Sequence, residues 1–143
     1  MTEIVLPEDS NPRGSVFGGR VLALIDKCAA IVAMRHARSE AVTVSVDSVV
    51  FVNKVMVGDV LLLHGRINAA FGSSMEIEVE VHDEHPLTGE SKLTTTAFVT
   101  MVAVTREGKP QRVPVLLAVN DDQRKRAEAA AGRRRRRLEE RPD

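Results

Sequence analysis

Residues 17–38 read FGGRVLALIDKCAAIVAMRHAR, and this stretch decides the fold. It follows turn chemistry at Asn11-Pro12-Arg13-Gly14, and the run beyond Gly18-Gly19 is helical in character for about 18 residues. Apolar side chains occupy nearly every face of the predicted helix, so we expect it to be buried and wrapped by other structure. The cationic side chains of Arg35, His36 and Arg38 mark its solvated C-terminal end.

Only strand signals follow this helix, in the runs 42–52, 60–70, 75–82 and 93–104. The first run changes phase near Asp47 and Ser48, which indicates a β-bulge. The third alternates strictly, so its apolar residues are expected to face inward and its glutamates outward. The connections are short, which favours antiparallel neighbours. The sequence therefore predicts an α+β domain, with one antiparallel sheet curled around one central helix.

Composition narrows the class of protein. The 143 residues contain 20 Lys plus Arg and 20 Asp plus Glu, no Trp and no Tyr, so neither net charge nor stacking aromatics favours a nucleic-acid partner. The single cysteine, Cys28, fits a reducing compartment. The first residues lack a signal-peptide pattern, and the longest apolar stretch, 21–34, is too short to span a membrane. We expect a cytoplasmic protein with no membrane partner.

The charge balance differs along the chain. Residues 1–119 carry 11 basic and 14 acidic side chains, whereas 120–143 carry 9 basic and 6 acidic ones. We divide the chain into a domain, 1–117, and an Ala/Arg/Glu-rich tail, 118–143, expected to be a solvated helix or a disordered end. Acidic residues flank the run Arg133 to Arg137, which favours solvation. Nucleic-acid binding through this run is an alternative, and it predicts binding that weakens steeply with salt.

Asp26 is the most informative residue, because its helix neighbours are apolar and an unpaired buried carboxylate is costly. One interpretation is structural, either an ion pair with Lys27 or Arg20 or a carboxylate at a dimer seam. The other interpretation is catalytic, with Asp26 acting as a general base or a nucleophile.

The Gly18-Gly19 pair lies at the start of the helix, where backbone N–H groups lack partners and the helix dipole is positive. These amides can polarise a carbonyl oxygen, although the glycines can also serve only a tight turn. Gly19 and Asp26 lie on one helix face but are about 10 Å apart along the axis. A site that uses both is more easily built from two chains, which predicts at least a homodimer.

Other chemistry-bearing residues are weaker candidates. His82-Asp83-Glu84-His85 offers metal-ligand side chains, but it lies on a hairpin and is expected to be a solvated loop, so no metal site is predicted. Cys28 is expected to be an inert core thiol. There is no GxSxG elbow and no P-loop in the sequence, so a serine hydrolase or a nucleotidase has no support.

The motifs in their order resemble a known family. The stretch Asn11 to Gly19, followed by Leu24-Ile25-Asp26 and Ala29-Ala30, is similar to the opening of hotdog-fold acyl-CoA thioesterases of the cytosolic acyl-CoA hydrolase type. The similarity extends over residues 5–117 through these later segments: Val42 to Asp47, Phe51, Val57-Gly58-Asp59, Gly72 to Glu76, and Phe98 to Pro114. One departure is Phe51-Val52-Asn53-Lys54, where many relatives have a proline ahead of the Val-Gly-Asp turn.

The resemblance implies a hotdog fold and hydrolysis of fatty acyl-CoA to a free fatty acid and CoA. Asp26 matches the catalytic aspartate, Asn11 the asparagine that positions substrate or water, and Thr43 a supporting hydroxyl. Gly19 falls where the family offers a helix N-terminal N–H to the thioester oxygen. The family's Asn and Asp come from different protomers, so a homodimer is the expected minimal active unit, assembled further as a trimer of dimers, a hexamer.

No cofactor is expected, since coenzyme A is part of the substrate. Cations are needed for its phosphates, and the expected CoA-binding residues are Arg66, Lys92, Arg106, Lys109, Ser73 and Ser74. Two alternatives stay open on the same fold. One is a non-catalytic acyl-CoA-binding or sensor protein. The other is a hydratase or dehydratase that pairs His with an acid, although His36 lies ten residues along the helix from Asp26.

Overall fold

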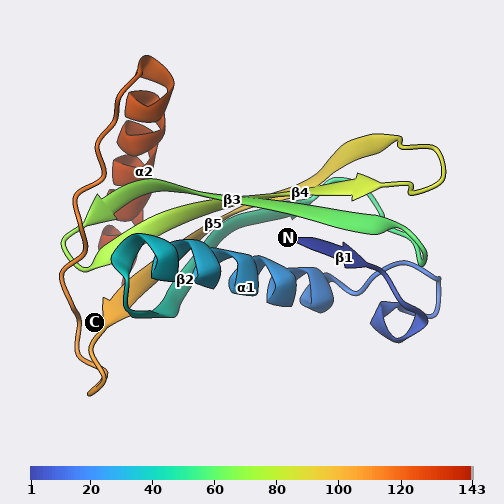
Figure 1. Cartoon of the computed structure of the whole chain (residues 1–143), viewed down its shortest axis with the longest axis horizontal. Coiled ribbons are helices and arrows are strands. Elements are labelled where there is room, and N and C mark those ends of the chain that lie inside the picture. Colours follow the sequence, from blue (N-terminus) through green and yellow to red (C-terminus); the bar gives the residue numbers. More distant parts are fainter. Residues whose placement is uncertain (143) are drawn as a thin grey trace.

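A curled antiparallel sheet packs against one long helix, α1, and a second helix, α2, crosses the other face of the sheet (Figure 1). The computed structural model describes residues 1–142. Its elements are β1 (Thr2–Ile4), the 3-10 helix η1 (Pro7–Asp9), α1 (Gly18–Ala37), β2 (Glu40–Phe51), β3 (Val60–Phe71), β4 (Ser74–Glu84), β5 (Ser91–Val104) and α2 (Asp121–Glu139). The strand order is β1-β3-β4-β5-β2, with every neighbouring pair antiparallel. The predicted α+β architecture is confirmed.

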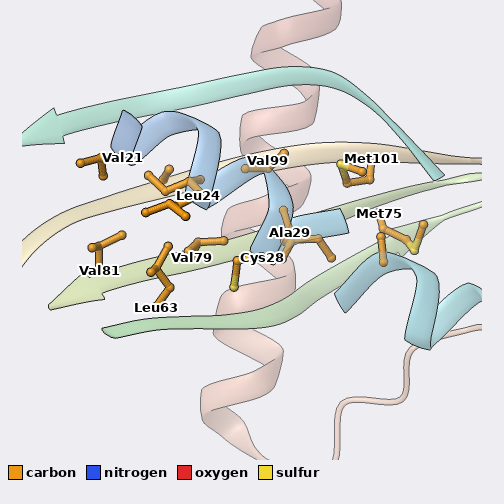
Figure 2. Packing of buried hydrophobic residues seen from close by; sticks show 14 of the residues in the cluster. Val21, Leu24, Cys28, Ala29, Leu63, Met75, Val79, Val81, Val99 and Met101 are labelled. Carbon is orange, nitrogen blue, oxygen red and sulfur yellow. The ribbon is translucent and has the colours of Figure 1, made fainter. Parts of the chain in front are cut away.

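The core lies between α1 and the concave face of the sheet. Strict alternation in β4 turns one row of side chains inward, and Figure 2 shows these residues meeting the inner face of α1. Burial of this row removes apolar surface from water, which is the main force that holds the helix on the sheet. The fully buried residues of this core include Val21, Ile25 and Ala29 of α1, Leu63 of β3, Met75, Ile77, Val79 and Val81 of β4, and Val99 of β5.

Gly65 of β3 allows α1 to approach the sheet closely. A Cβ atom at this position would lie 2.8 Å from Val32 Cγ2 and 3.0 Å from Cys28 Sγ. The first distance is shorter than a van der Waals contact between two carbon atoms, and the second is shorter than one between carbon and sulfur. The absence of a side chain at Gly65 therefore sets the helix-to-sheet distance at this point.

The prediction that α1 is wrapped on every side is wrong for the single chain. Leu22, Ile31 and Met34, on the part of the helix surface that the sheet leaves uncovered, are 39%, 38% and 41% exposed. The strands cover only one side of the helix, and β2 is an edge strand whose Val42 and Val46 are also exposed. We call this surface, formed by Leu22, Ile31, Met34 and Val46, the open apolar face.

The predicted bulge in β2 is present. The pairing of β2 with β5 shifts register between Asp47 and Val50, and Ser48 adopts a left-handed φ of 55°. A bulge of this kind bends the strand and increases its twist. The bend allows the long strand β2 to follow the curled sheet.

Residues 121–139, expected to be a solvated helix or part of a disordered end, form the helix α2, which packs on the outer face of the sheet. Asn120 caps this helix by accepting a hydrogen bond from the backbone N–H of Gln123 at 2.8 Å. Arg133 donates to both carboxylate oxygens of Glu76, at 2.9 and 2.7 Å, and Arg137 donates to Asp47 at 3.1 Å. Within residues 1–142, no helix combines the length and apolar character needed to cross a membrane.

Candidate active site

Asp26 and Thr43 are in direct contact. The Thr43 hydroxyl of β2 donates a hydrogen bond of 2.5 Å to Oδ1 of Asp26 on α1, and its oxygen lies 3.3 Å from the sulfur of buried Met101. Two elements therefore define the orientation of the carboxylate, and its second oxygen remains available to a reacting group. A hydrogen bond of this kind holds a catalytic base in one rotamer without neutralising it.

The expected burial of Asp26 is wrong within one chain, since the residue is exposed beside the open apolar face. The structural ion-pair interpretation also fails for the described residues, because no ion pair joins Asp26 to Lys27 or Arg20. Arg20 instead pairs with Asp9 at 3.2 Å. Among the described residues, Asp26 is thus an exposed carboxylate that accepts a hydrogen bond from Thr43 but has no ion-pair partner.

Asn11 lies in the turn that leads into α1. Its side-chain oxygen accepts from the backbone N–H of Arg13 at 2.9 Å and of Ser15 at 3.3 Å, and its amide donates to the Ser15 hydroxyl at 2.8 Å. Asparagine commonly bonds its own backbone in this way in tight turns. The side chain is half-buried and rigidly placed at the N-terminal end of the helix.

The first turn of α1 presents the backbone N–H groups of Gly18 and Gly19. The following amides, of Arg20 and Val21, bond to the carbonyl of Phe17 at 3.0 and 3.3 Å. Gly19 is exposed, and a Cβ placed there would meet nothing within 4 Å, so the surface beside its Cα is open. Helix N-terminal amides of this kind stabilise negative charge.

A groove of about 320 Å³ opens next to this helix end. Most of its side chains are apolar, and Gly18 forms part of its wall. The apolar lining residues are Val16, Val21, Phe51, Val52 and Val55. The groove therefore offers an apolar channel that begins beside the helix N-terminal amides.

Asn11 and Gly19 lie at one end of α1, whereas Asp26 and Thr43 lie further along it. Seven residues separate Gly19 from Asp26, which is about 10 Å of helix. A single chain therefore holds the Asp26–Thr43 pair at one place and the helix-end amides at another.

The expected CoA-binding residues are not gathered at one place. Arg66 pairs with Glu78 at 2.7 Å and with Glu80 at 3.2 Å on the outer face of the sheet, and these contacts raise the pKa of its guanidinium further. Lys92 is the second residue of β5, and Arg106 and Lys109 lie in the exposed turn after that strand. Ser73 and Ser74 occupy the β3–β4 turn, at the opposite end of β4 from the residues that pair with Lys92.

Two further candidates can be placed. Burial raises the pKa of the Cys28 thiol, as expected for an inert core cysteine. The residues His82 to His85 run from the end of β4 into the hairpin. Among the residues that the structure describes, no group of three or more His, Cys, Asp or Glu side chains has the arrangement of a metal site.

Sequence reasoning missed the arginines of α2 as residues that contact the domain. They were interpreted as a solvated run, yet Arg133 stacks 3.8 Å above the centre of the Phe98 ring and pairs with Glu76, which is only 3% exposed. The available signal was the spacing of Arg133 and Arg137, which lie four residues apart and therefore on one helix face.

Comparison with known proteins places these features in a family. A family model described as the thioesterase superfamily matches residues 13–90. The chain belongs to the thioesterase superfamily. It is 39% identical over 122 residues to an uncharacterized acyl-CoA thioester hydrolase, YkhA, of Bacillus subtilis, a match that covers 85% of this chain and 71% of that protein. It is also 39% identical to the cytosolic acyl coenzyme A thioester hydrolase of Mus musculus, but that match covers 86% of this chain and only 33% of the mouse protein.

Solved structures agree with this assignment and with the predicted hotdog fold. An apo hexameric acyl-CoA thioesterase is 45% identical, with a TM-score of 0.91 and coverage of 97% of this chain and 89% of the other. An acyl-CoA hydrolase from Staphylococcus aureus, solved with butyryl coenzyme A, coenzyme A and coenzyme A disulfide, is 35% identical, with a TM-score of 0.88 and coverage of 96% and 84%. Alanine variants of that enzyme at an aspartate, an asparagine and a threonine have also been solved.

Proposed function

We propose that this chain is an acyl-CoA thioesterase whose catalytic carboxylate is Asp26. The observation that carries the proposal is the hydrogen bond from Thr43 to Asp26, which orients an exposed carboxylate beside the open apolar face. In the S. aureus enzyme the substituted asparagine, aspartate and threonine are spaced 15 and 17 residues apart. Asn11, Asp26 and Thr43 have the same spacing, which supports equivalent roles here.

In the proposed reaction, Asp26 takes a proton from a water molecule as that water attacks the thioester carbonyl carbon. The negative charge that develops on the carbonyl oxygen is stabilised by the Gly19 N–H at the helix N-terminus. Collapse of the tetrahedral intermediate breaks the C–S bond and releases the free acid and the CoA thiolate. The thiolate takes up the proton that Asp26 removed from the water. Asn11 helps to position the substrate or the water, and Thr43 holds Asp26 in its reactive rotamer.

The proposed active unit is a homodimer, because one chain keeps Asp26 and Gly19 about 10 Å apart along the same helix. A second copy packed on the open apolar face would bring its own helix end toward Asp26 and cover Leu22, Ile31 and Met34. Several structural relatives are hexameric, and a trimer of dimers is part of the proposal for this chain. A cytoplasmic location is also proposed, because the mouse relative is named a cytosolic hydrolase.

Fatty acyl-CoA is the proposed substrate class. The groove beside Gly18 is the proposed site for the acyl chain, since its lining is largely apolar and it begins next to the amides that would bind the thioester oxygen. The CoA-binding roles of Arg66, Lys92, Arg106, Lys109, Ser73 and Ser74 stay predictions.

The decisive test compares thiol release from short, medium and long acyl-CoAs by the native protein and by Asp26→Asn. We expect the variant to lose about a hundredfold or more in kcat with an unchanged oligomeric size. Glu40→Gln, which removes an exposed carboxylate at the start of β2, is the matched control and should keep native turnover.

If the native protein binds CoA but releases no thiol from any member of the panel, the thioesterase proposal fails and an acyl-CoA-binding protein takes its place. An acyl adduct on Asp26 in acid-quenched protein would indicate direct attack by the carboxylate instead of water activation.

A further inference from the structure

Three hydrogen bonds join Asn11 to Ser15, four residues further along the same turn. The backbone N–H of Asn11 donates to the carbonyl of Ser15 at 2.8 Å, and the backbone N–H of Ser15 donates to Oδ1 of Asn11 at 3.3 Å. The third bond joins the side chains, from Nδ2 of Asn11 to Oγ of Ser15, at 2.8 Å. The N–H, the carbonyl and the hydroxyl of Ser15 thus all contact the asparagine proposed for the active site.

Ser15 is itself held in place by the fold. It is only 9% exposed, and it forms a β-bridge to Met56 in the segment that precedes β3. The next residue, Val16, donates its backbone N–H to the carbonyl of Val55 at 2.8 Å. The hydroxyl of Ser15 is therefore an acceptor on a fixed piece of backbone.

These contacts determine which way the Asn11 amide points. Its oxygen accepts from two backbone N–H groups, that of Arg13 at 2.9 Å and that of Ser15 at 3.3 Å. If the amide were turned over, its NH₂ group would face these two donors, and an amide nitrogen has no lone pair with which to accept them. Only the observed orientation satisfies all the bonds of the turn.

The hydrogen-bonding capacity of Asn11 is almost used up. An amide side chain has two acceptor positions on its oxygen and two N–H donors on its nitrogen. The backbone N–H groups of Arg13 and Ser15 fill both acceptor positions, and the Ser15 hydroxyl accepts one of the donors. Within residues 1–142, the structure gives the other N–H no partner. Asn11 can therefore form one more hydrogen bond, and in that bond it can only donate.

We propose that Ser15 is a positioning residue that fixes the Asn11 amide, and that Asn11 acts in the reaction only as a donor, through its free N–H. The acceptor is a reacting oxygen, either that of the thioester carbonyl or that of the attacking water. Asp26 alone then accepts the proton of the water, because Asn11 has no acceptor position left. This assignment rests on the proposed thioesterase function and gives its two polar side chains different roles.

Asn11→Asp separates donation from acceptance. The carboxylate can still accept from the backbone N–H groups of Arg13 and Ser15, and aspartate suits such a turn as asparagine does. It has no N–H to donate to a reacting oxygen. We expect kcat for thiol release to fall about a hundredfold, as far as in Asn11→Ala, at native oligomeric size. A kcat within about threefold of native in either variant would overturn the proposal.

Ser15→Ala tests the positioning role. The backbone bonds of the turn remain, but the Asn11 amide loses the acceptor that holds it, so its free N–H is no longer aimed at one point. We expect kcat to fall about tenfold on short and on medium acyl-CoAs alike, while KM changes less than about twofold. Ser15→Thr keeps the hydroxyl and should restore kcat to within about threefold of native.

Ser15 also borders the groove proposed for the acyl chain, and the KM values separate the two roles. A loss that appears only in KM and varies with acyl-chain length would assign Ser15 to the groove and overturn the positioning role.

Ser10→Ala is the matched control. The Ser10 hydroxyl belongs to the same N-terminal segment but donates to the carbonyl of Pro7 at 2.6 Å, away from Asn11. This variant should keep native kcat. Equal losses in Ser10→Ala and Ser15→Ala, or a Ser15→Thr variant as slow as Ser15→Ala, would show a general structural effect and overturn the proposal.

Failure of this assignment and failure of the proposed function give different results. If the native protein releases thiol and Asn11→Asp keeps native kcat, the assignment falls and the proposed role of Asp26 stands. If the native protein releases no thiol from any acyl-CoA, the thioesterase proposal falls and this assignment falls with it.

Discussion

Asp83 makes the stability of this protein depend on pH, and Asp83→Asn is the perturbation that isolates the effect. The residue is 6% exposed near the end of β4, opposite Lys92 on β5. Burial raises the pKa of its carboxyl from 3.8 to about 6, and the neighbouring Asp59 carboxyl adds to the rise, while Lys92 and His85 oppose it.

A carboxyl whose pKa is higher in the folded state than in the unfolded state stabilises the fold fully only at pH values below its unfolded-state pKa. That stabilisation is lost as the pH rises through the folded pKa, because the unfolded chain then ionises more readily than the folded one. A rise from 3.8 to about 6 for Asp83 corresponds to a total loss of about 3 kcal/mol. About 2 kcal/mol of that loss falls between pH 4.5 and pH 7.5.

The assay is urea unfolding of the native protein and of Asp83→Asn at a series of pH values and at one fixed protein concentration. The stability of the variant relative to the native protein should rise by about 2 kcal/mol between pH 4.5 and pH 7.5 and then level off. Glu84→Gln, the next residue along β4, controls for the loss of one carboxylate at the strand end. A difference between Asp83→Asn and native protein that stays constant across this range would refute the reasoning.

Three further substitutions test the fold and the site. Gly65→Ala should destabilise the protein by about 1–3 kcal/mol, measured as a lower urea midpoint, because the added methyl overpacks the contact with α1. Thr43→Val should lower kcat by about tenfold or more at unchanged oligomeric size in the thiol-release assay, because Asp26, the proposed catalytic carboxylate, loses the group that orients it. Glu76→Gln should cost about 3 kcal/mol in the same unfolding assay, because it leaves the guanidinium of Arg133 without its buried partner. Native stability of Glu76→Gln would show that α2 contributes little to the fold.

Local pattern was enough to predict most of the elements. The helix at 18–37 and the inward row of β4 follow from the periodicity of apolar residues, and both are present. The short strand β1 was missed, because three residues, Thr2 to Ile4, carry too little periodicity to stand out. The bulge was predictable because a change of phase in a strand is itself a feature of the sequence.

The candidate site was predictable in part. The apolar neighbours of Asp26 suggested an unusual carboxylate, and the resemblance to a family indicated Thr43 as its supporting group. The geometry that brings the two into contact depends on how α1 packs beside β2, 17 residues later in the chain. The distribution of cations over the surface, which separates Arg66 from Lys92 and Arg106, was not visible in the sequence.

The sequence by itself determined the fold class and the family, and it pointed to Asp26 as the carboxylate proposed for catalysis, because these depend on residue types and on spacings along the chain. Only the tertiary structure decided which side of α1 stays open and that α2 packs on the sheet. The pairs that hold α2, Arg133 with Glu76 and Arg137 with Asp47, join residues 57 and 90 positions apart. Periodicity reports which face of an element is apolar or charged, but the partner of that face is set by segments distant in the chain.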